Sequence, residues 1–113
     1  MSKAGAGVYS RYTQDAMLLL ASLIRESRLE RRMTAQEVAD RAGISRGLLQ
    51  RIEKGDLKCQ VGAVFEVALI VGVPLFGMDD EADLRFQLHQ TRAKLALMPQ
   101  SIRRSNKQVQ DDF

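Results

Sequence analysis

The stretch that decides the fold is TAQEVADRAGISRGLLQRIEKG, residues 34–55. It opens on a capping box, because the Thr34 hydroxyl can accept from the Glu37 amide while the Glu37 carboxylate reaches back. The inward-facing residues of the helix that follows are Val38, Ala39 and Ala42. Gly43 suits the left-handed position just past a helix end. The sequence therefore predicts a short capped helix that ends in a tight turn.

A second short helix follows this turn. Ser45 is its cap candidate, and the helix runs to about Lys54, where Gly55 stops it. Leu49 and Ile52 are its core positions. A turn as tight as Gly43-Ile44 sets two helices at a steep angle and lets the second project outward. A projecting helix of this length fits the major groove of B-DNA, while the first helix can point its free amides at a phosphate.

Three further helices flank this pair. Residues 1–12 are predicted to be a flexible arm, since they are rich in Gly, Ala and Ser with no apolar period. The first helix is expected over residues 13–31, with an inward stripe made of Ala16, Leu19, Leu20, Leu23 and Ile24. A helix over residues 61–71 is apolar nearly all round, which predicts deep burial, and Gly72 and Pro74 end it.

The last helix is predicted from Asp80 to Met98, and residues 99–113 form a polar tail. Its apolar stripe has alternating spacings of four and three and consists of Leu84, Leu88, Thr91, Leu95 and Met98. This stripe suits either docking on the core or a two-helix seam between subunits, and we favour packing that also contributes to a homodimer. The predicted divisions are 1–12, the arm; 13–78, the helix-turn-helix domain; 79–98, the last helix; and 99–113, the tail. No strand is predicted.

Charge and composition narrow the class of protein. The net charge is +3, and between Arg28 and Lys58 eight cations face five acids, so this stretch carries the whole excess. Such a stretch indicates either a phosphate-facing surface or a solvated charged face. The single cysteine, Cys59, excludes an intrachain disulfide and fits a reducing cytosol. The apolar stretches are too short or interrupted to span a bilayer, and no secretory signal is expected, so we predict a cytoplasmic protein.

Catalytic chemistry has no support in the sequence. His89 and Cys59 each lack a second ligand nearby, and the acids of residues 79–83 lack the alternating spacing of an EF-hand. No Gly-rich phosphate loop or nucleophile motif is present. We expect no enzyme activity, no cofactor and no metal.

Residues 34–55 resemble the signature of the Cro/CI-type (XRE) helix-turn-helix regulators, with a likeness that runs from about Thr13 to Leu75. The resemblance implies an all-α, five-helix lambda-repressor-like helix-turn-helix domain, counting a short helix or turn past Pro74, with an additional C-terminal helix.

The last helix and the tail, with residues 73–76 before them and residues 97–99 and 111–113 after, are further similar to HipB-like antitoxins of HipA-type kinase toxins. Members of that group bind operator DNA as dimers, repress their own operon and bind the kinase. The expected partners are therefore double-stranded operator DNA, a second copy of the chain and a HipA-like kinase toxin.

On this pattern the base-contacting positions of the recognition helix are Arg46, Gly47, Gln50 and Arg51. Arg can grip guanine with two hydrogen bonds, and Gln can do the same for adenine. Gly47 either allows close approach to the groove or is a tolerated surface glycine. Leu48 either touches a thymine methyl or packs in the core. Phosphate contacts are expected at Arg32, Thr34, Gln36, Ser45, Lys54 and Lys58.

One position departs from the family pattern. The family commonly has Gln directly after the first cap, where it bonds a phosphate and braces the first base-contacting residue, but this chain has Ala35. Gln36 is one step away and faces differently, so the brace for Arg46 is missing. The family also often joins the first helix to the end of the recognition helix, which implies an Arg28–Glu53 ion pair.

Two alternatives to the antitoxin interpretation remain. One is a stand-alone regulator without a toxin, whose last helix serves dimerisation only. The other is a protein-interaction module that kept the fold and lost DNA binding, which Ala35 and Gly47 favour.

Overall fold

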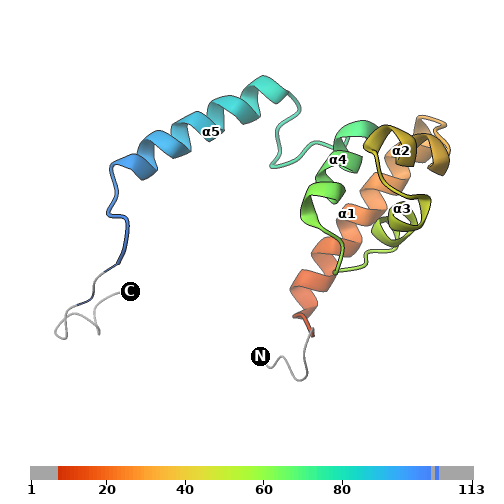
Figure 1. Ribbon diagram of the computed structural model, residues 1–113, viewed down its shortest axis with the longest axis horizontal. Coiled ribbons are helices and arrows are strands. Elements are labelled where there is room, and N and C mark those ends of the chain that lie inside the picture. The colour runs from red at the N-terminus through yellow and green to blue at the C-terminus, as the bar shows by residue number, and fades with distance from the viewer. Residues whose placement is uncertain (1–7, 103, 105–113) are drawn as a thin grey trace. The chain divides into compact units, whose positions relative to one another are not determined.

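The computed structural model describes residues 8–102 and residue 104. The regular secondary structure of this part consists of α1 (Arg11–Glu30), α2 (Ala35–Ala42), α3 (Arg46–Glu53), α4 (Val61–Val71) and α5 (Glu81–Ala96), as Figure 1 shows. The described residues contain no strand beyond an isolated bridge between Leu75 and Met78. The all-α helix-turn-helix fold expected from the sequence is confirmed.

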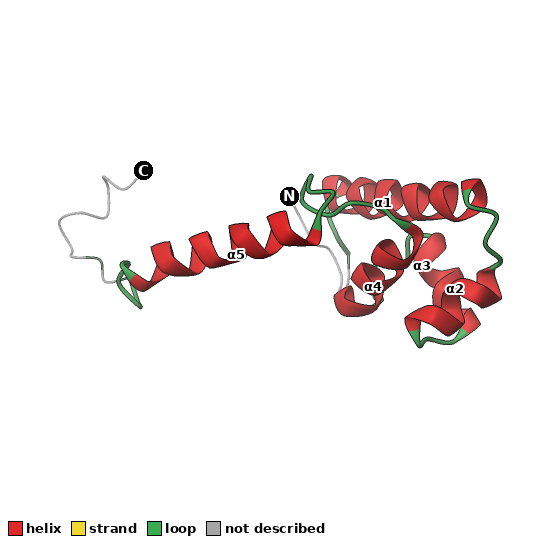
Figure 2. Cartoon of the chain, turned by 90° about the horizontal axis from the view of Figure 1, so that it is seen from above, coloured by secondary structure: helices red, strands yellow, loops and turns green. Residues whose placement is uncertain are grey.

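The chain divides into two compact units, Met1–Asp79 and Asp80–Phe113. In the first unit, α1 packs against α3 and α4, and α2 packs against the same two helices. Figure 2 shows α2, α3 and α4 gathered on one side of α1. The helix-turn-helix, formed by α2 and α3, is therefore held by the long first helix and by α4.

The core of this unit is aliphatic. Each of its four helices contributes at least one side chain with no exposed surface, among them Ile24, Val38, Leu49, Ile52 and Val67. No polar or charged residue is buried among the described residues. Core residues lie in α2 before the turn and in α3 after it. The angle between the two helices is therefore set by packing as well as by the turn.

The helix ends follow the predicted caps. The Thr34 hydroxyl accepts from the Glu37 amide at 3.0 Å, and the Glu37 carboxylate accepts from the Thr34 amide at 2.7 Å. Gly43 follows α2 with φ +70°, the left-handed conformation that glycine adopts without strain. Helix α1 begins two residues before the expected Thr13, because the Ser10 side chain accepts from the Thr13 amide and caps the helix there.

The inward face of α1 differs from the predicted stripe. Ala16, Leu19 and Leu23 are exposed, and Leu19 exposes 60% of its surface. The residues that face the core are Met17, Leu20, Ala21 and Ile24. Both sets recur at helical spacing, so the periodicity alone did not distinguish them, and the part of the prediction that placed Ala16, Leu19 and Leu23 inward is wrong.

Helix α4 has the predicted bounds but is not buried all round. Val64, Val67 and Val71 are buried, whereas Val61 and Leu69 are exposed. The reason is that α1 and α2 cover only one side of α4.

A turn follows Pro74, one of the two possibilities that the sequence allowed at this point. Phe76 and Gly77 have φ values of +56° and +69°, and the Met78 amide donates to the Leu75 carbonyl. The ring of Phe76 meets that of Phe65 edge to face, with ring centroids 6.2 Å apart.

The second unit contains α5. Its cap is Asp80, whose side chain accepts from the Ala82 amide at 2.9 Å, and the helix ends at Ala96 rather than at the expected Met98. No residue of α5 is buried, and the predicted stripe is exposed along its length. Residues 1–7 of the predicted arm, and residues 103 and 105–113 of the predicted tail with the segment 111–113, lie outside the described residues.

Candidate nucleic-acid interface

Packing on the core decides which face of α3 is exposed. Leu49 and Ile52 are fully buried, and Leu48 is half-buried and packs against the same core. Core packing is thus the role that Leu48 has in this structure. The exposed residues are Arg46, Gly47, Gln50 and Arg51 in α3, and Lys54 directly after it.

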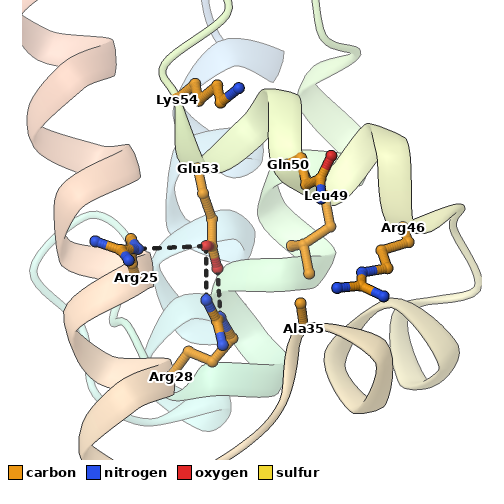
Figure 3. Close-up of a pocket in the computed structure, with 8 residues that line it drawn as sticks. All are labelled: Arg25, Arg28, Ala35, Arg46, Leu49, Gln50, Glu53 and Lys54. Atoms are coloured by element: carbon orange, nitrogen blue, oxygen red, sulfur yellow. Dashed lines mark hydrogen bonds and ion pairs between the residues drawn. The ribbon is translucent and has the colours of Figure 1, made fainter.

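A cavity of about 490 Å³ lies beside this exposed face, between α1, the start of α2 and α3. Figure 3 shows the side chains around it. Its lining carries four cations, one acid and three uncharged residues: Arg25, Arg28, Arg46, Lys54, Glu53, Ala35, Leu49 and Gln50. The cavity therefore has a surplus of positive charge next to two of the predicted base-contacting residues.

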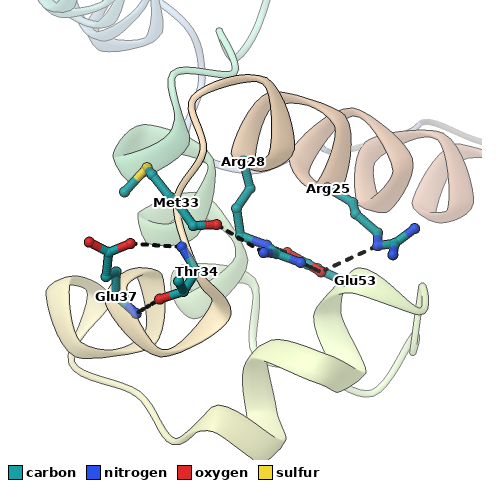
Figure 4. Close-up of polar contacts among 6 residues, drawn as sticks. All are labelled: Arg25, Arg28, Met33, Thr34, Glu37 and Glu53. Carbon is teal, nitrogen blue, oxygen red and sulfur yellow. Dashed lines mark hydrogen bonds and ion pairs between the residues drawn. The ribbon is translucent and has the colours of Figure 1, made fainter.

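The inner wall of the cavity is the Arg28–Glu53 ion pair, which confirms the pairing implied by the family resemblance. Arg28 Nε donates to Glu53 Oε2 at 2.7 Å, and Nη2 donates to Oε1 at 3.0 Å. Arg28 Nη1 also donates to the Met33 carbonyl at 3.0 Å, so the pair ties α1 to α3 and to the chain before α2 (Figure 4). The hydrogen bond to Glu53 raises the pKa of Arg28.

Arg25 stands one turn before Arg28 on α1 and also approaches Glu53. Its Nε lies 3.9 Å from Glu53 Oε1, which is an ion-pair separation but too long for a hydrogen bond. The Arg25 side chain is 61% exposed, whereas Glu53 is 10% exposed. Arg25 is thus held near the cavity by charge alone.

The brace that the family usually gives to the first base-contacting residue is absent from the described residues. Figure 3 shows the Arg46 side chain extending toward Ala35 and Leu49, and the short Ala35 side chain has no polar group to meet it. Gln36 does not brace Arg46 instead, since its Nε2 donates to Asp40 Oδ1 at 2.9 Å along α2. The Arg46 guanidinium therefore makes no hydrogen bond within the described residues.

Arg51 does not line the cavity. Its Nε donates to Asp56 Oδ2 at 2.8 Å, and Asp56 Oδ1 accepts from the Lys58 amide at 2.9 Å. These bonds lower the pKa of Asp56, and the bond to Asp56 raises the pKa of Arg51. The structure thus brings Arg46 and Gln50 together around one cavity and directs Arg51 toward the loop that follows α3.

The predicted phosphate contacts lie in several places. The hydroxyls of Thr34 and Ser45 accept from the amides of Glu37 and Leu48, each at 3.0 Å. A hydroxyl that accepts in this way still has its own proton to donate to a phosphate oxygen. Lys54 lines the cavity.

Two other predicted phosphate contacts lie outside the cavity lining. Arg32 is in the turn before α2 with φ +56°, and Lys58 is in the loop after α3. Both residues are exposed.

Sequence reasoning missed two charged residues beside the recognition helix. Arg25 is three positions before Arg28, so the two side chains share one face of α1, and this spacing was the available signal. Asp56 had no such signal, because its contact with Arg51 depends on how the loop after Gly55 turns back.

Neither a metal-binding cluster nor a membrane-spanning helix occurs in the described part of the chain. Among residues 8–102 and 104, no group of three or more His, Cys, Asp and Glu side chains could hold a metal ion. None of the helices in this part of the chain combines the length and apolar character needed to cross a membrane.

The comparison with known proteins agrees with this geometry. The model of one protein family, described as a helix-turn-helix domain, matches residues 19–75, which is just over half of the chain. No curated protein and no solved structure matches the sequence. The matched region begins within α1 and ends after α4, so it contains every residue that lines the cavity.

Proposed function

The chain belongs to the helix-turn-helix family, and from this premise we propose that it is a sequence-specific DNA-binding transcriptional repressor. The observation that carries the proposal is the exposed face of α3, where the side chains of Arg46 and Gln50 make no hydrogen bond in the described part of the chain. An unpaired polar face on a core-anchored helix of this size suits insertion into the major groove.

In the proposed complex, α3 carries the base contacts. Arg46 would grip guanine through two donors, and Gln50, one turn later, would pair with adenine. Gly47 lies between them and has no side chain, so it would let the helix backbone approach the groove. Arg51 would join them once it leaves Asp56.

The start of α2 and the ends of α3 would hold the DNA backbone. The hydroxyls of Thr34 and Ser45, together with the N-terminal amides of their helices, face a phosphate favourably. The cations Arg32, Lys54 and Lys58 and the amide of Gln36 would add contacts that depend little on sequence.

A gel shift with DNA selected from a random duplex pool tests the proposal, at stated salt concentrations. Arg46→Ala should cost about 1–3 kcal/mol of binding free energy on the selected site and relax the preference at one base position. The matched control is Arg85→Ala on α5, which removes the same charge and should leave the preference unchanged. An equal loss on every sequence would make Arg46 a phosphate contact, and absence of any specific band would favour a protein-interaction module.

We further propose that the repressor acts as a homodimer and as the antitoxin of a HipA-like kinase toxin. The dimer proposal rests on the exposed apolar stripe of α5, and the toxin proposal rests on the likeness of residues 73–76 and 97–99 to HipB-like antitoxins. Co-purification from the native host tests the second part: recovery of a kinase supports an antitoxin, and recovery of the repressor alone favours a stand-alone regulator. A cytoplasmic location stays a prediction.

A further inference from the structure

The cavity beside α3 holds more positive charge than its own acid can balance. Arg28 and Glu53 neutralise each other through two hydrogen bonds. The remaining cations of the lining are Arg25, Arg46 and Lys54, and none of their side chains donates a hydrogen bond within the described ranges. Three cations around one cavity repel each other, so an anion that enters it would be stabilised.

Arg25 is the cation that no other role accounts for. Both oxygens of Glu53 already accept from Arg28, and Arg25 stays 3.9 Å from the nearer oxygen. Glu53 therefore keeps the Arg25 guanidinium beside the cavity without occupying its donors. A guanidinium has a planar fork of donors that matches the oxygens of a phosphate.

The cavity also has room for such a group. Its volume is about 490 Å³, and the side chain at its α2 edge is Ala35. A longer side chain at this position would extend into the space that separates α1 from α3. The departure from the family pattern at Ala35 thus leaves open a space with cations on its α1 and α3 sides.

We propose that this cavity is a phosphate-binding pocket that takes a phosphate of the DNA backbone, with Arg25 and Lys54 as its ligands. The inference rests on the proposed DNA binding and adds α1 to the elements that contact DNA. Arg46 lines the same cavity, so the bound phosphate supplies the polar neighbour that Ala35 cannot provide.

The first test is the salt dependence of DNA affinity for Arg25→Gln, followed by fluorescence anisotropy. The slope of log affinity against log salt is negative, and loss of one phosphate contact should make it less steep by about 0.9, equally on selected and unrelated duplexes. The matched control is Arg11→Gln, which removes the same charge from the start of the same helix and should leave the slope unchanged.

A second variant blocks the pocket without altering charge. Ala35→Leu should lower the DNA affinity, because the leucine occupies the space of the phosphate. It should also make the salt slope less steep by the same amount as Arg25→Gln. Combining it with Arg25→Gln should change the slope no further, since both changes remove one contact. Thermal unfolding of each variant shows whether it is folded.

Several results would overturn the inference. An unchanged slope in Arg25→Gln, with a lower melting temperature only, would make Arg25 a structural partner of Glu53. If Arg11→Gln changes the slope equally, the effect is due to the overall charge of the protein. If the unmodified protein binds no DNA, the proposed function fails together with this inference; if it binds and only the Arg25 result is negative, the proposed function stands.

Free inorganic phosphate distinguishes the source of the anion. The melting temperature of the unmodified protein is measured in phosphate and in chloride of equal ionic strength. If it is higher in phosphate, and Arg25→Gln abolishes the difference, the pocket binds phosphate. If phosphate stabilises the protein in this way but Arg25→Gln leaves the salt slope of DNA binding unchanged, the pocket binds phosphate. The DNA backbone is then not the source of that phosphate.

Discussion

Arg51 and Asp56 form an exposed ion pair at the end of the recognition helix. Arg51 Nε donates to Asp56 Oδ2 at 2.8 Å, and the side chains are 53% and 33% exposed. Exposed pairs of this kind contribute little to stability, because water solvates both partners well. In the proposed complex with DNA this pair has another consequence, because the charge of Asp56 holds Arg51 toward the loop and competes with a base for it.

The first prediction is that Asp56→Asn raises DNA affinity. The asparagine keeps the oxygen that accepts from the Lys58 amide and removes the charge that holds Arg51. We expect binding to tighten roughly two- to fivefold, which corresponds to the free energy that an exposed ion pair contributes. Anisotropy titrations measure it. In an Arg51→Ala background the same substitution should have no effect; a similar gain there would indicate that Asp56 acts by repelling the DNA directly.

Glu37 is the one carboxylate of the α2 capping box, and its ionisation couples this cap to pH. The bond from the Thr34 amide, and then the bond with the Thr34 side chain, lower the pKa of Glu37 from its ordinary value of 4.5. A carboxyl whose pKa is lower in the folded state adds stability above its unfolded pKa, and loses that contribution as the pH falls through the folded pKa.

The second prediction follows from this sign. Above pH 4.5 the unmodified protein should be more stable than Glu37→Gln, which keeps the hydrogen bond of the box without the charge. The difference should shrink as the pH falls below that value and disappear once Glu37 is protonated. Urea unfolding across pH measures it. A difference that does not vary with pH would assign the stabilisation to side-chain shape.

At the scale of the elements, two glycines of the helix-turn-helix have opposite conformational demands. Gly43 ends α2 with φ +70°, and a Cβ there would meet nothing within 4 Å. Gly47 lies inside α3, where a Cβ would have only the Ser45 hydroxyl oxygen, 4.0 Å away, as a neighbour. Space is therefore available at both positions, and backbone conformation alone separates them.

The third prediction compares alanine at the two positions. Gly43→Ala should lower the free energy of unfolding by about 1–2 kcal/mol, the cost of a left-handed residue with a Cβ. Gly47→Ala should raise it by roughly 0.5–1 kcal/mol, because alanine is the better helix former. If Gly47 lets α3 approach the groove, the more stable Gly47→Ala protein should bind DNA more weakly. Unchanged affinity would make Gly47 a tolerated surface glycine.

At the scale of the whole molecule, the helix-turn-helix unit has a buried core, and the described part of the second unit has none. Every helix from α1 to α4 buries side chains, whereas α5 buries none. Its exposed apolar residues include Leu84, Leu88 and Leu95. A helix with this stripe gains stability by burying it against another surface. The proposed dimer provides such a surface and would present two recognition helices to two half-sites.

The fourth prediction concerns this dimer. The double variant Leu88→Glu/Leu95→Glu should weaken dimerisation by about tenfold or more, since each buried leucine contributes roughly 1.5–3 kcal/mol. Light scattering coupled to size-exclusion chromatography measures the mass. The matched control Gln87→Glu/Gln90→Glu adds the same charge to α5 outside the stripe and should remain dimeric. If the unmodified protein is monomeric, or if both double variants weaken dimerisation equally, the stripe does not form the dimer interface.

Local signals in the sequence were enough to predict the helix-turn-helix itself. The caps at Thr34 and Ser45, and the left-handed Gly43, depend on neighbours within four residues, so each could be recognised from spacing alone. The Arg28–Glu53 pair followed from the family resemblance. The DNA roles of Arg46, Gly47, Gln50 and the phosphate contacts remain proposals.

Only the tertiary structure decided which sides of the apolar helices are covered. Helices α1 and α4 each carry more apolar residues than one face can hold, so Leu19 and Leu69 are exposed while Ile24 and Val67 are buried. The cavity beside Ala35 likewise needs α1, α2 and α3 in place. Contacts between distant segments have no local signal, whereas caps and turns do, and this difference separates what the sequence determined from what the fold added.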